Sequence, residues 1–129
     1  MKIYIAARYA RAEEMRGIAD QLTADGHQII STWIDGEHNE GPEAAAIDLA
    51  EIRYSDVVLC FTDPCGSKNS GGGRWFECGY ALAIGKRVIF IGDREIVFCH
   101  LPEVEVYPSL ARARLALCLL YTSPSPRDS

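Results

Sequence analysis

The chain has 129 residues, of which 48% are hydrophobic and 24% charged, and its formal net charge is −5. This length predicts one domain with a single core, and the composition is ordinary for a soluble globular protein. The acidic balance argues against a nucleic-acid polymer as partner, because such binding needs clustered lysines and arginines. No apolar run is long enough to span a membrane, and the first residues are typical of a strand rather than a signal peptide, so we expect a cytoplasmic protein without a membrane partner.

Alternating strand and helix patterns predict an α/β fold of flavodoxin or Rossmann-like type. Strands are expected at residues 2–7, 28–33, 56–62, 88–91 and, as a short fifth strand, 104–107. Helices are expected at residues 10–25, 43–54, between Gly73 and Gly85, and 108–117. Strands separated by helices form an open, mostly parallel sheet with helices on both faces, and we expect the strand order to be about 2-1-3-4-5.

The last residues, 118–129, break abruptly from the Ala/Leu/Arg helix before them. They resemble a translated sequencing adaptor, so we expect the native domain to span residues 1–117. On this interpretation the tail is not native and takes no part in function.

The five cysteines give no sign of a metal site or a disulfide framework. They show neither a C-x-x-C pair nor a zinc-ligand spacing. Cys60 and Cys78 lie inside apolar segments, where small buried thiols are the simplest interpretation. We therefore expect no metal and no cofactor.

A glycine-rich stretch before the third helix is the first candidate ligand site. It consists of Ser70, Gly71, Gly72 and Gly73. Glycines tolerate positive φ and let backbone N–H groups come close to a ligand. Glu77 is expected in about the first turn of the helix, where the helix dipole keeps a carboxylate ionised. Such a group is a nucleophile or an anchor for a hydroxylated ligand, or it only complements the dipole.

The predicted topology leads to the same place. Ligands of open parallel sheets bind beyond the carboxyl ends of the strands, where the strand order reverses. Here that point lies between the first and third strands, and the segments that open there are residues 7–9 and 63–73. The polar segment 34–42 follows the second strand and is a natural lid.

Asp48 is the second carboxylate of interest. It is the only charged residue in the apolar helix segment 44–50. A helix so apolar is expected to pack on the sheet over a broad face, which places Asp48 at a buried boundary, where a carboxylate needs a partner or a cleft. The alternative is a surface aspartate in a helix of small residues.

Three segments resemble the nucleoside 2-deoxyribosyltransferase family, which includes the 2′-deoxynucleoside 5′-monophosphate N-hydrolases. They are residues 3–7 (IYIAA), 48–58 (DLAEI followed by SDVV) and 73–88, which contains E-x-G-Y-A-x-A-x-G-K from Glu77 onward. The resemblance covers residues 2–116. It implies that Glu77 is the catalytic nucleophile, Asp48 a catalytic-site aspartate and Tyr4 a hydrogen-bond donor to the nucleophile. It also implies a homodimer or higher homo-oligomer.

The chemistry that this resemblance implies is cleavage of the N-glycosidic bond of a nucleoside or its 5′-monophosphate, by hydrolysis or base exchange. An ionised Glu77 would trap the sugar at C1′ as a covalent glycosyl-enzyme. A carboxyl group with a pKa raised by burial would protonate the departing base, and Asp48 is the candidate.

Further residues are candidates for holding the substrate. Arg8 and the stretch from Ser70 to Gly73 suit a 5′-phosphate, with Arg74 and Lys68 as additional cations. Trp33 and Tyr9 are candidates for stacking on the base. Solvated surface charges and packing aromatics are the competing interpretations.

Two other functions stay open at the level of sequence. The transferases have an aspartate where this chain has Gly71, which leaves room for a protein that binds or sequesters a nucleotide without turnover. An NAD-type glycohydrolase would use the same carboxylate chemistry.

Overall fold

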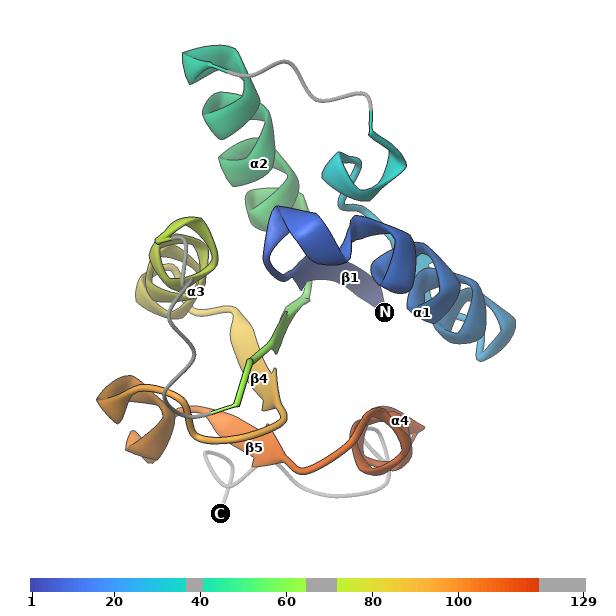
Figure 1. The fold of residues 1–129 in the computed structure, drawn as a ribbon, viewed down its shortest axis with the longest axis vertical. Coiled ribbons are helices and arrows are strands. Elements are labelled where there is room, and N and C mark those ends of the chain that lie inside the picture. Colours follow the sequence, from blue (N-terminus) through green and yellow to red (C-terminus); the bar gives the residue numbers. More distant parts are fainter. Residues whose placement is uncertain (37–40, 65–71, 119–129) are drawn as a thin grey trace.

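Five parallel strands form the centre of the computed structural model, which describes residues 1–36, 41–64 and 72–118 (Figure 1). The strands are β1 (Lys2–Ala6), β2 (Gln28–Ile29), β3 (Val57–Phe61), β4 (Arg87–Ile91) and β5 (Glu105–Tyr107). They are ordered β2-β1-β3-β4-β5, and every neighbouring pair is parallel. The predicted α/β fold and its strand order are therefore confirmed.

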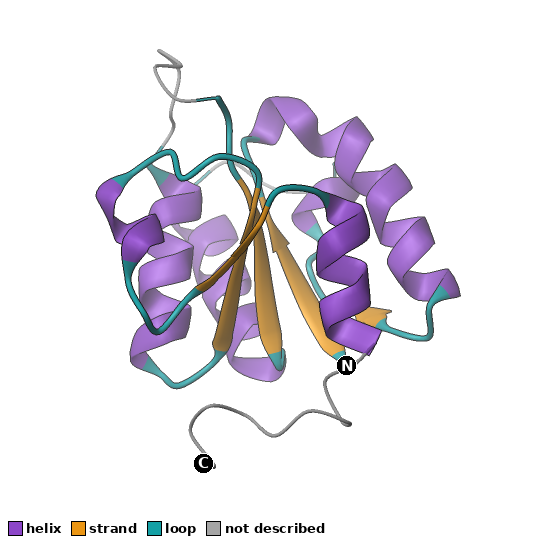
Figure 2. Cartoon of the chain, turned by 90° about the horizontal axis from the view of Figure 1, so that it is seen from below, coloured by secondary structure: helices purple, strands orange, loops and turns teal. Residues whose placement is uncertain are grey.

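Helices cover both faces of the sheet (Figures 1 and 2). The α-helices are α1 (Ala12–Ala24), α2 (Pro42–Tyr54), α3 (Gly73–Ala83) and α4 (Leu110–Cys118), and 3-10 turns occur at η1 (Tyr9–Arg11), η2 (Trp33–Asp35) and η3 (Val97–His100). Figure 1 shows α2 and α3 on one side of the sheet and α1 and α4 on the other. Within the described ranges, no helix is both long and apolar enough to cross a bilayer.

The core follows from this layering. Residues of β1 from Ile3 to Ala6 and all five residues of β3 are buried. Central parallel strands are covered by helices on both faces, so their sequences are continuous runs of apolar residues and do not alternate between apolar and polar residues. A side chain on β1 can therefore reach the α2 and α3 layer without meeting solvent.

The second strand is shorter than the sequence predicts. β2 ends at Ile29, and the chain then turns into η2 instead of remaining extended to Trp33. The indole N–H of Trp33 donates to the carbonyl oxygen of Ile5 at 2.6 Å, and the residue is 5% exposed. The prediction of strand over 28–33 is wrong because this tertiary contact draws Trp33 into the core.

The apolar segment of α2 does not pack on the sheet over a broad face, so that prediction is also wrong. Ile52 is the one fully buried residue of α2, and Ile47 is 45% exposed. Asp48 and Leu49 are partly buried. A helix at the edge of its layer turns only a narrow stripe inward, and small alanines permit the remaining faces to stay in water.

Candidate active site

Tyr4 and Glu77 form the centre of the candidate site. Tyr4 lies in the middle of β1 and is fully buried, and its hydroxyl donates to Oε2 of Glu77 at 2.7 Å. Glu77 is partly buried and lies in the second turn of α3, since the helix begins at Gly73. The prediction of a first-turn position is therefore wrong, and the influence of the helix dipole is correspondingly weaker there.

The protonation of Glu77 also differs from the prediction. The pKa of the Glu77 carboxyl is raised to about 8. Burial is the largest cause, the hydrogen bond from Tyr4 opposes it, and the charge of Asp48 and a hydrogen bond with Asp48 add to the rise. Glu51 adds a smaller repulsion that raises the same pKa. Glu77 is thus mostly protonated at neutral pH, because burial and the neighbouring carboxylates raise its pKa more than the helix dipole near the N-terminus of α3 lowers it.

Asp48 and Glu51 lie one turn apart on α2 and share a face of the helix. Glu51 accepts hydrogen bonds from the backbone nitrogen of Thr32 at 3.1 Å and from its hydroxyl at 2.8 Å, which fixes α2 against the segment that follows β2. The sequence argument missed Glu51, although the D-x-x-E spacing was a signal that both carboxylates face the same way. Three carboxyl groups from two helices therefore act on one another beside Tyr4.

Tyr4 remains a donor in this environment. Burial raises the pKa of the Tyr4 phenol far above its ordinary value, and the charges of Glu77, Asp48 and Glu51 raise it further. A phenol that cannot ionise always offers its proton to Glu77. It therefore favours the ionised form of Glu77 and holds the carboxyl group in one orientation.

Asp48 acts on Glu77 through its charge and through a hydrogen bond. Two carboxyl groups in hydrogen-bond contact do not both ionise easily, and this adds to the raised pKa of Glu77. Glu77 is an acid while it holds its proton and a base once it has lost it. Cleavage of a glycosidic bond needs both of these functions.

A cluster of arginines surrounds Asp63 just beyond the carboxyl end of β3. The Asp63 carboxylate contacts Nε of Arg8 at 2.5 Å, Nη1 of Arg11 at 3.2 Å and Nη2 of Arg74 at 3.2 Å. Its side chain is only 5% exposed. Arg11 and Asp63 were not among the predicted site residues, because their meeting depends on the packing of α1 against the end of β3.

Arg74 is not available to a substrate, so the prediction that it binds phosphate is wrong. Its side chain is fully buried and makes a bidentate pair with Glu95, at 2.9 and 3.0 Å. It also donates to the carbonyl oxygen of Phe61 at 3.1 Å. Arg8 differs, because its side chain is 30% exposed and Asp63, through Nε, is its one partner among the described residues.

The glycine stretch is described only in part. Ser70, Gly71 and Lys68 lie outside the described residues. Gly72 precedes α3 with φ −76°, and Gly73 is already helical, so neither adopts the positive φ that the sequence argument invoked. A Cβ atom added to either would meet nothing within 4 Å, so their backbone is open to close approach.

The two candidate aromatic residues take different positions. Tyr9 is 64% exposed, and its ring centroid lies 6.3 Å from that of Trp33. Trp33 is buried behind it, with its indole N–H bonded to β1. Tyr9 therefore offers an aromatic surface at the end of β1, and Trp33 supports it from the core.

No family model and no curated protein matches the chain. Solved structures do match. A 2-desoxiribosyltransferase from Leishmania mexicana superimposes with a TM-score of 0.64 at 19% identity, over 95% of this chain and 99% of that one. The CMP N-glycosidase BcmB of Clostridium botulinum superimposes with a TM-score of 0.61 at 20% identity, over 92% of this chain and 99% of that one.

The chain shares their fold. The match spans almost the full length of both known structures, so the chain has the whole architecture of these proteins rather than a fragment of it. Among the described residues, no group of three His, Cys, Asp or Glu side chains is placed to hold a metal ion. Cys60, Cys78, Cys99 and Cys118 carry free thiols.

Proposed function

We propose that the protein cleaves the N-glycosidic bond of a (2′-deoxy)nucleoside or its 5′-monophosphate. The observation that carries this proposal is the hydrogen bond from Tyr4 to Glu77, in a site where Asp48 acts on the same carboxyl group through its charge and a hydrogen bond. Two solved structures of this fold, titled as a 2-desoxiribosyltransferase and a CMP N-glycosidase, support the same class of reaction.

In the proposed mechanism, the proton that Glu77 holds at neutral pH passes to Asp48 through their hydrogen bond. Asp48 then gives it to the nitrogen of the departing base, which takes the electron pair of the C1′–N bond. The Glu77 carboxylate stabilises the developing cation and closes on C1′ to form a glycosyl ester. Tyr4 holds Oε2 throughout, which limits the motion of the nucleophile.

The second half of the reaction uses the same groups. Ionised Asp48 accepts a proton from an incoming water, and the water oxygen displaces Glu77 from C1′ and regenerates the carboxylate. With water the product is free sugar or sugar phosphate. With a second base, the product is a new nucleoside.

The substrate-binding roles are part of this proposal. Arg8, together with the backbone N–H groups of Gly72 and Gly73 and the neighbouring Ser70 and Gly71, would hold a 5′-phosphate. The partial exposure of Arg8 and the open space over the glycines support this role. Tyr9, backed by Trp33, would stack on the base.

The test is a panel of deoxynucleosides and their 5′-monophosphates, with free base followed by chromatography. We expect base release by the native protein, its loss in Glu77→Ala, and unchanged release in Glu13→Ala, which alters an exposed carboxylate on α1. Absence of base release from every substrate, or release that survives Glu77→Ala, would refute the proposal. The sugar product distinguishes hydrolysis from base exchange.

A nucleotide-binding protein without turnover is the second candidate. The mostly protonated state of Glu77 at neutral pH favours it, because a protonated carboxyl group is a poor nucleophile. Tight binding of a 5′-monophosphate that is recovered chemically intact would favour a nucleotide-binding protein over an enzyme. Release of nicotinamide from NAD would instead identify a glycohydrolase of the NAD type.

We also propose that the protein forms a homodimer or a higher homo-oligomer. Large apolar side chains are exposed on the helices of the active-site layer, with Phe76 on α3 at 69% and Ile47 on α2 at 45%. A contiguous patch of such residues is typical of a surface that a partner covers.

A further inference from the structure

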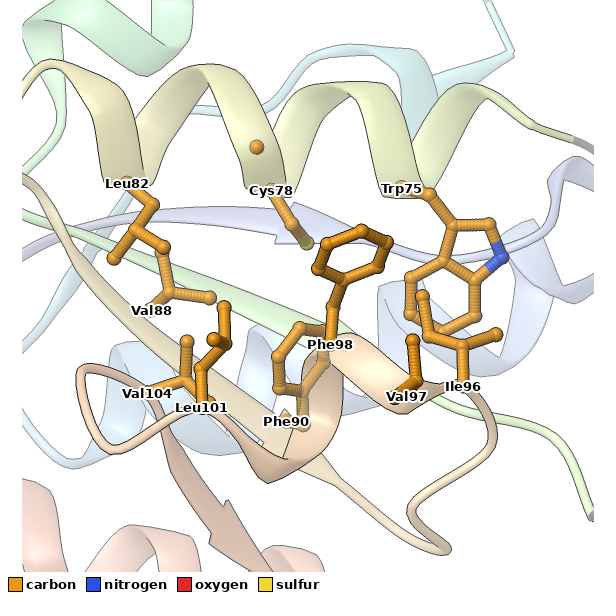
Figure 3. A pocket seen from close by; sticks show the side chains of 11 residues that line it. Trp75, Cys78, Leu82, Val88, Phe90, Ile96, Val97, Phe98, Leu101 and Val104 are labelled. Atoms are coloured by element: carbon orange, nitrogen blue, oxygen red, sulfur yellow. The ribbon is translucent and has the colours of Figure 1, made fainter.

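A cavity lies on the other side of α3 from Glu77. It has a volume of about 480 Å³, is open to solvent on one side and is lined by α3, β4 and the segment from Ile96 to Val104 (Figure 3). Trp75, Cys78, Gly79 and Leu82 line it from α3, at the spacing of one helix face. Glu77 belongs to a different face and does not line the cavity.

The cavity has no charged side chain in its lining. Its remaining walls are aliphatic and aromatic, as the Val88, Phe90 and Phe98 side chains in Figure 3 show. The polar atoms of the lining side chains are the Cys78 thiol and the Trp75 indole nitrogen. A charged ligand would lose its hydration there without gaining a partner. The lining therefore selects for a neutral, apolar molecule.

The walls are tied together by polar contacts just outside the cavity. The fully buried Arg74, next to Trp75, is paired with Glu95, which precedes Ile96 on the opposite wall. Nη1 of Arg94 donates to the carbonyl oxygen of Cys99 at 2.5 Å, which fixes the turn η3. A cavity held in this way exists before a ligand arrives, so binding costs little ordering.

Gly79 makes the helical wall open. It lies in the interior of α3, where glycine is less favourable than alanine, yet a Cβ atom there would meet nothing within 4 Å. The rings of Trp75 and Phe90 pack against each other, with centroids 5.9 Å apart, and together form an aromatic wall of the cavity. At the outer wall Val97 is 74% exposed and Phe98 62% exposed, which places the entrance at η3.

We propose that this cavity is a binding site for a small neutral apolar molecule of the size of a fused aromatic ring system. Its volume falls within the range of natural ligand pockets, roughly 300 to 1,000 Å³. Aromatic walls favour a ring that stacks on them edge-on or offset. The site is separate from Glu77 and does not depend on the proposed glycosidic chemistry.

The test uses N-phenyl-1-naphthylamine, a neutral dye whose fluorescence rises in apolar surroundings. Gly79→Leu fills the cavity, and Gly17→Leu is the matched control, because Gly17 also lies in a helix interior with nothing within 4 Å of its would-be Cβ. Val97→Asp places a charge at the exposed entrance, where it does not threaten folding. Melting curves of all three variants monitor the fold.

We expect one dye molecule per chain, with affinity at least about tenfold weaker in Gly79→Leu and Val97→Asp and unchanged in Gly17→Leu. A dye signal that is absent from the native protein, or equal in all variants, would overturn the proposal. So would a native oligomer that Gly79→Leu or Val97→Asp converts to monomer, because the cavity would then be filled by a second copy of the chain.

Discussion

Replacing Tyr4 by Phe tests the arrangement of the active site most directly. The substitution removes the hydroxyl that donates to Oε2 of Glu77 at 2.7 Å and keeps the buried ring. Because this hydrogen bond favours the ionised carboxylate, its loss raises the pKa of Glu77 above its present value of about 8. Asp48→Asn acts in the opposite direction, since it removes a repelling negative charge.

The size of the first shift follows from the strength of the bond. A hydrogen bond to a charged group contributes about 1.5 to 3 kcal/mol, and one pKa unit corresponds to about 1.4 kcal/mol. Tyr4→Phe is therefore expected to raise the pKa of Glu77 by about 1 to 2 units. The folded state should lose stability mainly at high pH, where Glu77 is ionised and most needs the donor.

The assay is a pH titration of the Glu77 side-chain carboxyl carbon by NMR in protein labelled with ¹³C-glutamate, with Glu77→Gln used to assign the signal. Tyr107→Phe is the control, since its hydroxyl donates to Glu105 at 2.8 Å, away from the site. An unchanged or lowered Glu77 pKa in Tyr4→Phe would refute the reasoning. So would a raised Glu77 pKa in Asp48→Asn.

Three further predictions follow from the same contacts. Folding raises the pKa of Glu77 from 4.5 to about 8, so the folded state binds the proton more tightly than the unfolded state does, and the free energy of unfolding falls by at most about 1.4 kcal/mol per pH unit as pH rises across that window. Glu77→Gln should remove this decline in denaturant titrations. A parallel decline in the variant would contradict the prediction. Arg74→Met should destabilise the protein by about 3 to 5 kcal/mol, because it leaves Glu95 buried without its cation and removes one of the three arginines that contact Asp63. A loss below about 1 kcal/mol in the same titrations would show that the Arg74–Glu95 pair is dispensable. Phe76→Ser should lower the mass measured by sedimentation equilibrium if the exposed face of α3 joins two copies, whereas an unchanged mass would place the interface elsewhere.

The trio of Tyr4, Glu77 and Asp48 shows how far sequence reasoning reached. Glu77 and Asp48 were selected from their places in the sequence and Tyr4 from the family resemblance alone, and the structure links all three through hydrogen bonds and charge interactions. Glu51, which joins them, was missed although its spacing from Asp48 was visible. The roles of these residues stay predictions until activity is measured.

The arginines show where sequence reasoning failed. Arg8 was the first candidate for binding a phosphate and Arg74 an additional one, since both lie close to the start of a helix near the expected site. Packing separates them, because Arg74 is buried in a pair with Glu95 and Arg8 remains partly exposed beside Asp63. The partners come from distant segments, so no local pattern could reveal the difference.

Hydrophobic periodicity and helix-ending glycines such as Gly85, with φ +84°, are local properties of the chain, so they were enough to predict the elements, their order and the parallel sheet. The raised pKa of Glu77, the burial of Trp33 in η2 and the apolar cavity on the opposite face of α3 could not be predicted in this way. These three depend on burial and on neighbours from other elements, and both arise only when the helices pack on the sheet.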